Sequence, residues 1–209
     1  MVIDITKIPV LCITVETAKD RHKRIHDLFA RFNLTNTHMI NGEILDKTGL
    51  SFIEVQTKKS GLVADAHIEA LTMFEPPFLI IEDDVLECRH QTKFDIPDDA
   101  DCLYLGSSVW GMLEGKSSQF GTKTKPYSED YCKVKDMLGI HAILYLTKSY
   151  IDATISNLST CKNRNQYCDE CVALDMENHD VYCVRQPVFY QHDGLNNQVT
   201  LFPLKDYPR

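Results

Sequence analysis

The sequence has no apolar stretch long enough to cross a bilayer as a helix, because charged and polar residues interrupt every apolar run. The first residues, Met1 to Lys7, also lack the basic start, apolar middle and small-residue cleavage site of a secretory signal. We therefore expect a cytoplasmic protein without a membrane span.

Dense blocks of lysine and arginine are missing as well, and the formal net charge is -8 at pH 7. Binding to a nucleic acid depends on neutralising its phosphates, so this charge balance predicts no nucleic-acid partner. An acidic protein can still hold a single nucleotide through a bridging metal ion.

The eight cysteines do not form the pattern of a complete zinc site. Cys168 and Cys171 make one CxxC, with Cys161 nearby, but no second CxxC supplies the remaining ligands. The two acids between Cys168 and Cys171 are expected to raise the thiol pKa, which disfavours a redox role. Without a secretory signal, we expect reduced thiols, with Cys12 and Cys183 as small core residues.

Internal repeats and low-complexity tracts are also absent, and 209 residues suffice for one sizeable domain. Apolar runs typical of strands alternate with segments of helical spacing, while residues 110–135 lack periodicity and are predicted to form a long loop. This alternation predicts a single-domain three-layer α/β fold with a mostly parallel central sheet. Strands are expected at 8–15, 37–42, 78–85, 101–108, 137–146, 181–184 and 187–194, and helices at about 16–32, 61–74, 148–158 and 169–178.

An acidic triplet directly follows the most apolar of these strands. Residues 78–81 are all apolar, and Glu82, Asp83 and Asp84 come next. Ligands of such sheets bind at the carboxyl ends of strands, and clustered carboxylates require a compensating cation or strong hydrogen bonds. Glu82 and Asp84 share one face of an extended chain, which suits Mn²⁺ or Mg²⁺ bridging to a pyrophosphate. The alternative is a surface turn that merely exposes three acids.

Other candidates have structural alternatives of similar weight. Arg21 lies early in the first predicted helix, where it can meet a phosphate or simply face solvent. His67 can face a site or belong to the edge of the core. Asp169 begins a late helix, where the macrodipole alone favours an acid. These residue types and positions leave both interpretations open.

The order of these features resembles GT-A glycosyltransferases, in particular family 25 sugar transferases of lipooligosaccharide synthesis and related viral proteins. The resemblance rests on four stretches that together span most of the chain: the first strand with Arg21 after it, Gly61 to His67, Ile80 to Val85, and Gly139 to Thr147. The sequence departs from the family where Asp65-Ala66 precedes His67 in place of the expected serine. The small size resembles a glycosyltransferase domain of a large algal virus, which implies the host cytosol.

The resemblance implies a Rossmann-like GT-A domain over residues 1–209, with a nucleotide-sugar half at about 1–110 and an acceptor half at about 111–209. It implies transfer of a sugar from a nucleotide diphosphate sugar, here a UDP-sugar, to a glycan or glycoprotein hydroxyl. Glu82, Asp84 and His192 are the implied ligands of the metal ion, and Asp169 or Glu170 is the implied acceptor-side carboxylate. Residues assigned to the donor are Thr14, Val15, Glu16, Arg21, His67, Glu82 and Asp83.

Two other functions remain compatible with the residues. A metal-dependent phosphohydrolase also uses acids at strand ends, although it commonly requires a second set of metal ligands, which the sequence does not show. A non-catalytic module that binds nucleotide sugars would keep the same pocket without turnover. The sequence leaves inversion and retention of the anomeric centre equally open.

Overall fold

The computed structural model of the protein describes residues 1–106, 123–164, 166–193 and 198–199. In this part of the chain, the largest sheet has eight strands in the order β3-β2-β4-β10-β7-β11-β9-β8. The strands are, in that order, Thr37–Asn41, Val10–Thr14, Phe78–Glu82, Ala142–Tyr145, Cys102–Tyr104, Val181–Val184, Tyr131–Lys135 and Lys123–Pro126.

The sheet is mixed, but most of its strands share one direction. β2 is parallel to both β3 and β4, and β7 is parallel to β11. β10 runs antiparallel between β4 and β7, and β9 runs antiparallel between β11 and β8. The predicted parallel arrangement therefore holds for all described strands of this sheet except β10 and β9.

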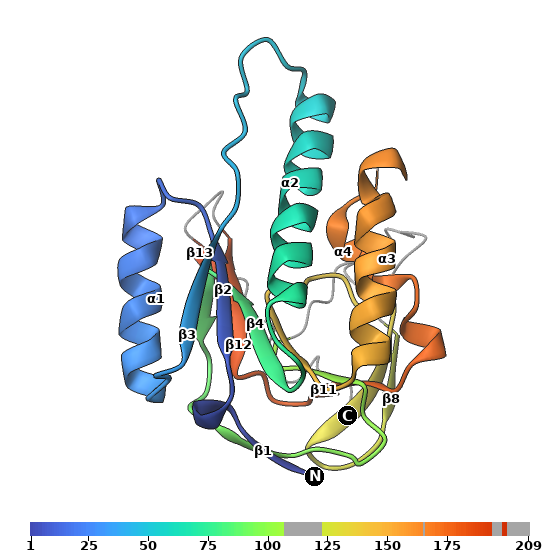
Figure 1. Ribbon diagram of the computed structural model, residues 1–209. Coiled ribbons are helices and arrows are strands. Elements are labelled where there is room, and N and C mark those ends of the chain that lie inside the picture. Colours follow the sequence, from blue (N-terminus) through green and yellow to red (C-terminus); the bar gives the residue numbers. More distant parts are fainter. Residues whose placement is uncertain (107–122, 165, 194–197, 200–209) are drawn as a thin grey trace.

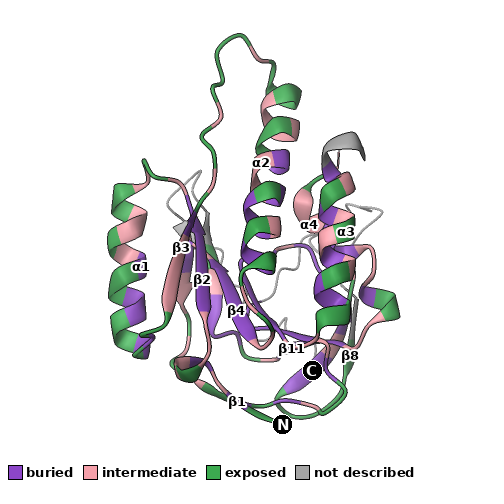
Figure 2. Cartoon of the chain, in the orientation of Figure 1, coloured by how far each residue is buried: buried purple, intermediate pink, exposed green. Residues whose placement is uncertain are grey.

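Helices cover both faces of the sheet, as Figure 1 shows. α1 (Lys19–Phe32) lies on one face, and α2 (Phe52–Thr72), α3 (Lys148–Arg164) and α4 (Cys168–Ala173) lie on the other. Two apolar clusters, one on each face, bury the central strands, which appear as buried ribbons in Figure 2. The predicted three-layer α/β architecture of a single Rossmann-like domain is confirmed.

The α1 helix forms as its pattern predicts. Ile25, Leu28, Phe29 and Phe32 recur at helical spacing and are buried against the sheet. The helix ends at Asn33, which adopts a left-handed conformation with φ of 54° and donates its backbone N–H to Ala30 and Phe29 carbonyls. The helix begins at Lys19, soon after β2 ends at Thr14, and Arg21 in its first turn contacts Asp83 of the acidic triplet.

The α2 helix begins nine residues earlier than predicted. Ser51 and Glu54 form a capping box, in which Ser51 N–H donates to Glu54 Oε2 at 2.8 Å and Glu54 N–H donates to Ser51 Oγ at 3.4 Å. Ser60 and Gly61, at the predicted start of the helix, are instead buried within it where it packs on α3. Their small size permits this close contact, so tertiary packing outweighs their low helix propensity.

The predicted long loop at 110–135 is partly wrong. Residues 107–122 lie outside the described part of the chain, but β8 and β9 form an antiparallel pair in the remainder. The predicted helix at 169–178 is likewise divided into α4 and a short 3-10 helix, η2 (Met176–Asn178). β8 and β9 are short and contain several polar residues, so their alternation of apolar and polar side chains is weak. The sequence pattern therefore did not predict these two strands.

Two smaller sheets flank the large one in the described residues. β1 (Val2–Asp4) pairs with β6 (Lys93–Asp95), and a 3-10 helix, η1 (Ile5–Lys7), follows β1. β12 (Phe189–Asp193) pairs with β5 (Val85–Glu87) and with β13 (Gln198–Val199). β5 begins directly after the acidic triplet, so the β12 pairing brings a late segment of the chain to the end of β4.

None of the helices among the described residues combines the length and apolarity needed to cross a membrane.

The cysteines are all present as thiols, and no disulfide joins them. Cys132 and Cys183 are register partners in β9 and β11, with their sulfur atoms 3.6 Å apart, well beyond the length of a disulfide bond. Titration of the unfolded protein without reductant is expected to find all eight thiols. A count of six that rises to seven in Cys132→Ser would show that this pair is oxidised and would contradict the prediction.

Candidate functional site

The carboxyl ends of β2, β3 and β4 meet at one edge of the sheet because the three strands are parallel. A cleft of about 470 Å³ opens there, between the strand ends on one side and α2 and α4 on the other. Open α/β sheets bind their ligands in crevices of this kind. All three acids of the triplet line the cleft, as does Asp169 from α4.

The middle acid of the triplet, Asp83, is committed to the protein itself. Its side chain is 5% exposed, and Arg21 Nη1 donates to its Oδ1 at 2.7 Å. The hydroxyl of Thr14 donates to its Oδ2 at 2.5 Å. A buried carboxylate is tolerated when it is paired and hydrogen-bonded in this way. Asp83 therefore joins the end of β2 and the start of α1 to the end of β4.

His22 adds a further link to this network. Its Nε2 lies 2.8 Å from Thr14 Oγ1 and 3.0 Å from the carbonyl oxygen of Val15. Because a carbonyl oxygen can only accept, Nε2 carries the proton and donates to both atoms. This leaves the Thr14 hydroxyl proton for Asp83, so the turn after β2 has a defined hydrogen-bond direction.

Glu82 is held from behind by a buried histidine. His67, from α2, is 1% exposed, and its Nε2 donates to Glu82 Oε1 at 3.3 Å. Burial acts to raise the pKa of Glu82, but the hydrogen bond and charge of His67 outweigh it and hold the pKa below its ordinary value. Glu82 is therefore ionised at neutral pH, with its second oxygen turned towards the cleft side.

A second buried histidine lies next to Glu82. The carbonyl oxygen of His141 accepts the backbone N–H of Glu82 at 3.0 Å, and burial lowers the pKa of its ring, which favours the neutral form. Gly106 makes room for this ring, since a Cβ there would lie 2.4 Å from His141 Nε2. Neither ring nitrogen of His141 has a hydrogen-bond partner among the described residues.

Asp84 and Glu82 share one hydrogen-bond donor. The side-chain Nε2 of Gln191, from β12, donates to Asp84 Oδ2 at 3.2 Å and to Glu82 Oε2 at 3.3 Å. Burial, followed by the charge of Glu82, raises the pKa of Asp84 to about 7. The other oxygen of Asp84, Oδ1, is buried without a partner within the described part of the chain.

These acids fit a hard divalent cation. Glu82 and Asp84 both contact the amide of Gln191, one oxygen of Asp84 is buried without a partner among the described residues, and carboxylate oxygens are ligands that Mn²⁺ and Mg²⁺ prefer. The described residues contain no group of three or more His, Cys, Asp or Glu side chains arranged for a metal ion. The predicted third ligand, His192, belongs to β12, but its side chain lies outside the described residues.

Asp169 and Glu170 differ in their surroundings. Glu170 Oε2 accepts the backbone N–H of Tyr167 at 3.3 Å, so it caps the start of α4. Asp169 lines the cleft, and burial, followed by the charge of Glu170 among the raising causes, lifts its pKa to about 6 despite a backbone hydrogen bond from Glu170. The structure thus places Asp169, rather than Glu170, where a ligand can meet a carboxylate.

The part of the cleft formed by the ends of β2 and β3, the segment after β3 and α2 carries both positively charged and apolar side chains. Lys47 and Lys59 are exposed at the wall, and the positive charge of Lys59 helps to lower the pKa of Glu82. Half-buried apolar side chains lie near the ends of β2 and β3 and on α2, namely Val15, Leu45 and Val63. The cleft therefore has an apolar part and a charged part.

Most of the predicted site residues come together around this cleft. Thr14, Val15, Arg21, Glu82, Asp83, Asp84 and Asp169 line it, and His67 contacts Glu82 from the buried side. Glu16 is exposed and is not among the lining residues. Its donor contact therefore stays a prediction.

Four residues of the site were missed by sequence reasoning: His22, Lys59, His141 and Gln191. His22 had a signal, since it directly follows Arg21 at the start of a helix. Lys59 was missed because α2 was predicted to begin after it. His141 lies in a stretch that was interpreted only as a strand, and Gln191 reaches the acids through strand pairing that no local pattern reveals.

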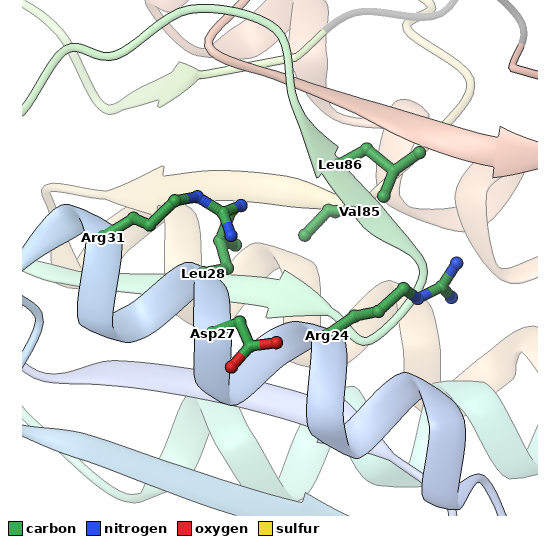
Figure 3. Close-up of a pocket in the computed structure, with 6 residues that line it drawn as sticks. All are labelled: Arg24, Asp27, Leu28, Arg31, Val85 and Leu86. Atoms are coloured by element: carbon green, nitrogen blue, oxygen red, sulfur yellow. The ribbon is translucent and has the colours of Figure 1, made fainter.

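A second hollow, of about 230 Å³, lies between α1 and β5 (Figure 3). Arg24 and Arg31 extend from α1 alongside Val85 and Leu86, with Asp27 as the acid at its edge. Arg31 is ion-paired with Glu87 at 3.0 Å. This hollow lacks the convergent carboxylates of the larger cleft, so we place the functional site at the ends of β2, β3 and β4.

The raised pKa of Asp169 predicts a pH-dependent stability difference. An unfolded aspartate ionises near pH 3.8, whereas Asp169 in the folded protein ionises near pH 6. The stability of the wild type relative to Asp169→Asn is therefore expected to fall by about 1–3 kcal/mol between pH 4 and 6 and to level off above pH 7. Urea unfolding of both proteins at intervals between pH 4 and 8 measures this difference.

Asp101 provides a control of opposite sign. Burial acts to raise its pKa, but hydrogen bonds from Thr147 and from the backbone of Asp180 lower it overall. The stability of the wild type relative to Asp101→Asn should therefore be lost as the pH falls through the lowered pKa. Parallel pH profiles for the two substitutions would contradict the prediction for Asp169.

No protein-family model and no curated protein sequence matches the chain. Among solved structures, it is similar to a nucleoside-diphosphate-sugar pyrophosphorylase from Vibrio cholerae RC9, with a TM-score of 0.42 and 10% sequence identity. The match covers 86% of this chain and 73% of that protein. Similarity at this level assigns neither a family nor an activity to the chain.

Proposed function

We propose that the protein is a metal-dependent glycosyltransferase that moves a sugar from a UDP-sugar to a hydroxyl of a glycan or glycoprotein. One observation carries the proposal: the cleft joins a pair of strand-end carboxylates, Glu82 and Asp84, to a separate carboxylate, Asp169, on another wall. Group transfer from a nucleotide sugar requires these two functions, one for the diphosphate and one for the acceptor.

The strand-end acids serve the donor side of the reaction. Glu82 and Asp84 would hold Mn²⁺ or Mg²⁺, which supplies Lewis-acid stabilisation of the leaving diphosphate. Arg21 and Lys59 add positive charge to the cleft, and the guanidinium of Arg21 is oriented by its ion pair with Asp83. The apolar part of the cleft suits the flat face of a uracil ring.

Asp169 serves the acceptor side. Its raised pKa makes it a stronger base than an ordinary aspartate, while it remains mostly ionised at neutral pH. In an inverting reaction it accepts the proton of the attacking hydroxyl. In a retaining reaction the same carboxylate orients the sugar instead.

The resemblance to family 25 glycosyltransferases supports this assignment, because the matching stretches contribute Arg21, His67 and the Glu82–Asp84 triplet to one place. We keep the division into a donor half and an acceptor half as part of the proposal, although Gln191, from the second half, also reaches the donor-side acids. The first half provides the strand ends and the α2 wall, and the second half provides Gly139, Ile140 and Asp169. A cytoplasmic location and a viral source remain part of the proposal.

Measuring UDP release distinguishes this function from its alternatives. A transferase releases UDP from a UDP-sugar faster when the acceptor is present, whereas a phosphohydrolase acts equally without acceptor. A binding module shows saturable binding and no release. Screening nucleotide sugars by thermal shift with Mn²⁺ selects the donor for this assay.

The metal bridge predicts that UDP binding depends on the cation. Calorimetry should detect UDP in the presence of Mn²⁺ and lose about tenfold or more in affinity in EDTA, because the diphosphate then faces uncompensated carboxylates. Asp84→Asn is expected to show the same loss in Mn²⁺, with its fold retained. Equal UDP affinity with Mn²⁺ and EDTA would rule out the bridge.

The proposed role of Asp169 predicts a separation of binding from turnover. Asp169→Asn should bind the UDP-sugar and Mn²⁺ normally but lose about 10²-fold or more in transfer rate, because it cannot accept a proton. Glu170→Gln is the matched control, since glutamine also caps a helix start and Glu170 does not line the cleft. Transfer that survives in Asp169→Asn but fails in Glu170→Gln would move the role to Glu170.

A further inference from the structure

The position of Gln191 identifies a feature of the cation site that the acids alone do not provide. Its side-chain nitrogen lies within hydrogen-bond distance of one oxygen of Glu82 and one of Asp84. This single donor therefore contacts both carboxylates that we propose as cation ligands. The amide group thus partly compensates the charge of the pair.

Few other side chains among the described residues are available as a further ligand of a cation at Glu82 and Asp84. Both oxygens of Asp83 are engaged, one by Thr14 and one by Arg21. His67 uses its Nε2 on the far oxygen of Glu82. The atoms that remain are the oxygens of Glu82 and Asp84 that contact the amide of Gln191, the amide itself, and Asp84 Oδ1, which is buried without a hydrogen-bond partner in the described part of the chain.

Backbone pairing fixes the location of this amide. Gln191 is the register partner of Val85 in the antiparallel pair of β12 and β5. Val85 directly follows Asp84, so the same ladder that holds β5 also holds Gln191 beside the acids. Its side chain is exposed, and the amide is therefore free to rotate without disturbing the core.

The side-chain amide of glutamine carries one donor atom and one acceptor atom. Its nitrogen donates and its oxygen accepts, and a half-turn of the group exchanges their places. With the nitrogen inward, the amide satisfies two carboxylates. With the oxygen inward, three oxygen atoms converge, which is unfavourable alone but favourable around Mg²⁺ or Mn²⁺.

We propose that Gln191 is a ligand of the divalent cation through its side-chain oxygen, and that its amide nitrogen bridges Glu82 and Asp84 when the cation is absent. This inference rests on the proposed function, because it names a further ligand of the same cation. It assigns a neutral third ligand, so two ionised carboxylates balance the cation and the diphosphate retains its attraction to the nearby Arg21 and Lys59.

Binding of Mn²⁺ alone to protein stripped with EDTA tests the inference. The free Mn²⁺ signal in electron paramagnetic resonance and calorimetry both measure the Kd without any turnover. Gln191→Met, which removes the amide and keeps the length, should weaken Mn²⁺ binding about tenfold or more. Gln191→Glu, which places a carboxylate there, should bind Mn²⁺ at least as tightly as the wild type.

Gln186→Met is the matched control. The side-chain oxygen of Gln186 accepts a hydrogen bond from Arg89 at 3.2 Å and is not among the residues that line the cleft, so its replacement should leave the Kd for Mn²⁺ unchanged. Thermal unfolding in EDTA verifies that all three variants are folded. Mn²⁺ binding to Gln191→Met that equals or exceeds that of the wild type would overturn the inference.

The failure of this inference is distinguishable from failure of the proposed function. If the wild type binds Mn²⁺ and Gln191→Met binds it equally well, only the role of Gln191 is lost, and the amide is then a competitor of the cation. If the wild type does not bind Mn²⁺ with or without UDP, both the cation dependence of the transferase and the role of Gln191 are refuted.

Discussion

The burial of one carboxylate organises the functional end of this protein. Asp83 is nearly inaccessible to solvent, and it is stable there because Thr14 and Arg21 satisfy both of its oxygens. Its backbone N–H also donates to the carbonyl oxygen of Ile13 in β2. The end of β4, the end of β2 and the first turn of α1 are thereby held together, and the acids on either side of Asp83 are turned towards the cleft.

The carboxylic acids of the cleft differ in pKa because their surroundings differ. His67 keeps Glu82 ionised, whereas burial and the charge of Glu82 leave Asp84 with a pKa of about 7. Asp169 has an intermediate pKa of about 6, because burial raises it and a backbone hydrogen bond opposes the rise. The cleft consequently carries less negative charge than its number of carboxylates suggests, which lowers the repulsion of a phosphate-bearing ligand.

Local sequence patterns predicted the fold better than they predicted the site. The apolar run predicted a strand at 78–85, and β4 is Phe78–Glu82; the helical spacing predicted a helix at about 16–32, and α1 is Lys19–Phe32. The start of the strand and the end of the helix were thus correct. The acidic triplet was found because its three residues are adjacent in the sequence as well as in space. By contrast, α2 was predicted to begin too late, at Gly61, because the residues before it are polar and weakly patterned.

Two of the four missed site residues have a common cause. Gln191 and His141 reach Glu82 through the pairing of strands that are far apart in the sequence, and such pairing has no local signature. Prediction from a single sequence is thus strongest where function depends on one segment.

The two walls of the cleft belong to different layers of the molecule, as the positions of α2 and the sheet in Figure 1 make clear. The acids belong to the sheet edge, whereas Gln56, Lys59 and Val63 repeat along one side of the outer part of α2. Substitutions on that side of the helix alter the shape of the cleft without changing a strand of the core. The architecture therefore permits the shape of the cleft to diverge in evolution while the carboxylates at the sheet edge and the stability of the sheet are kept.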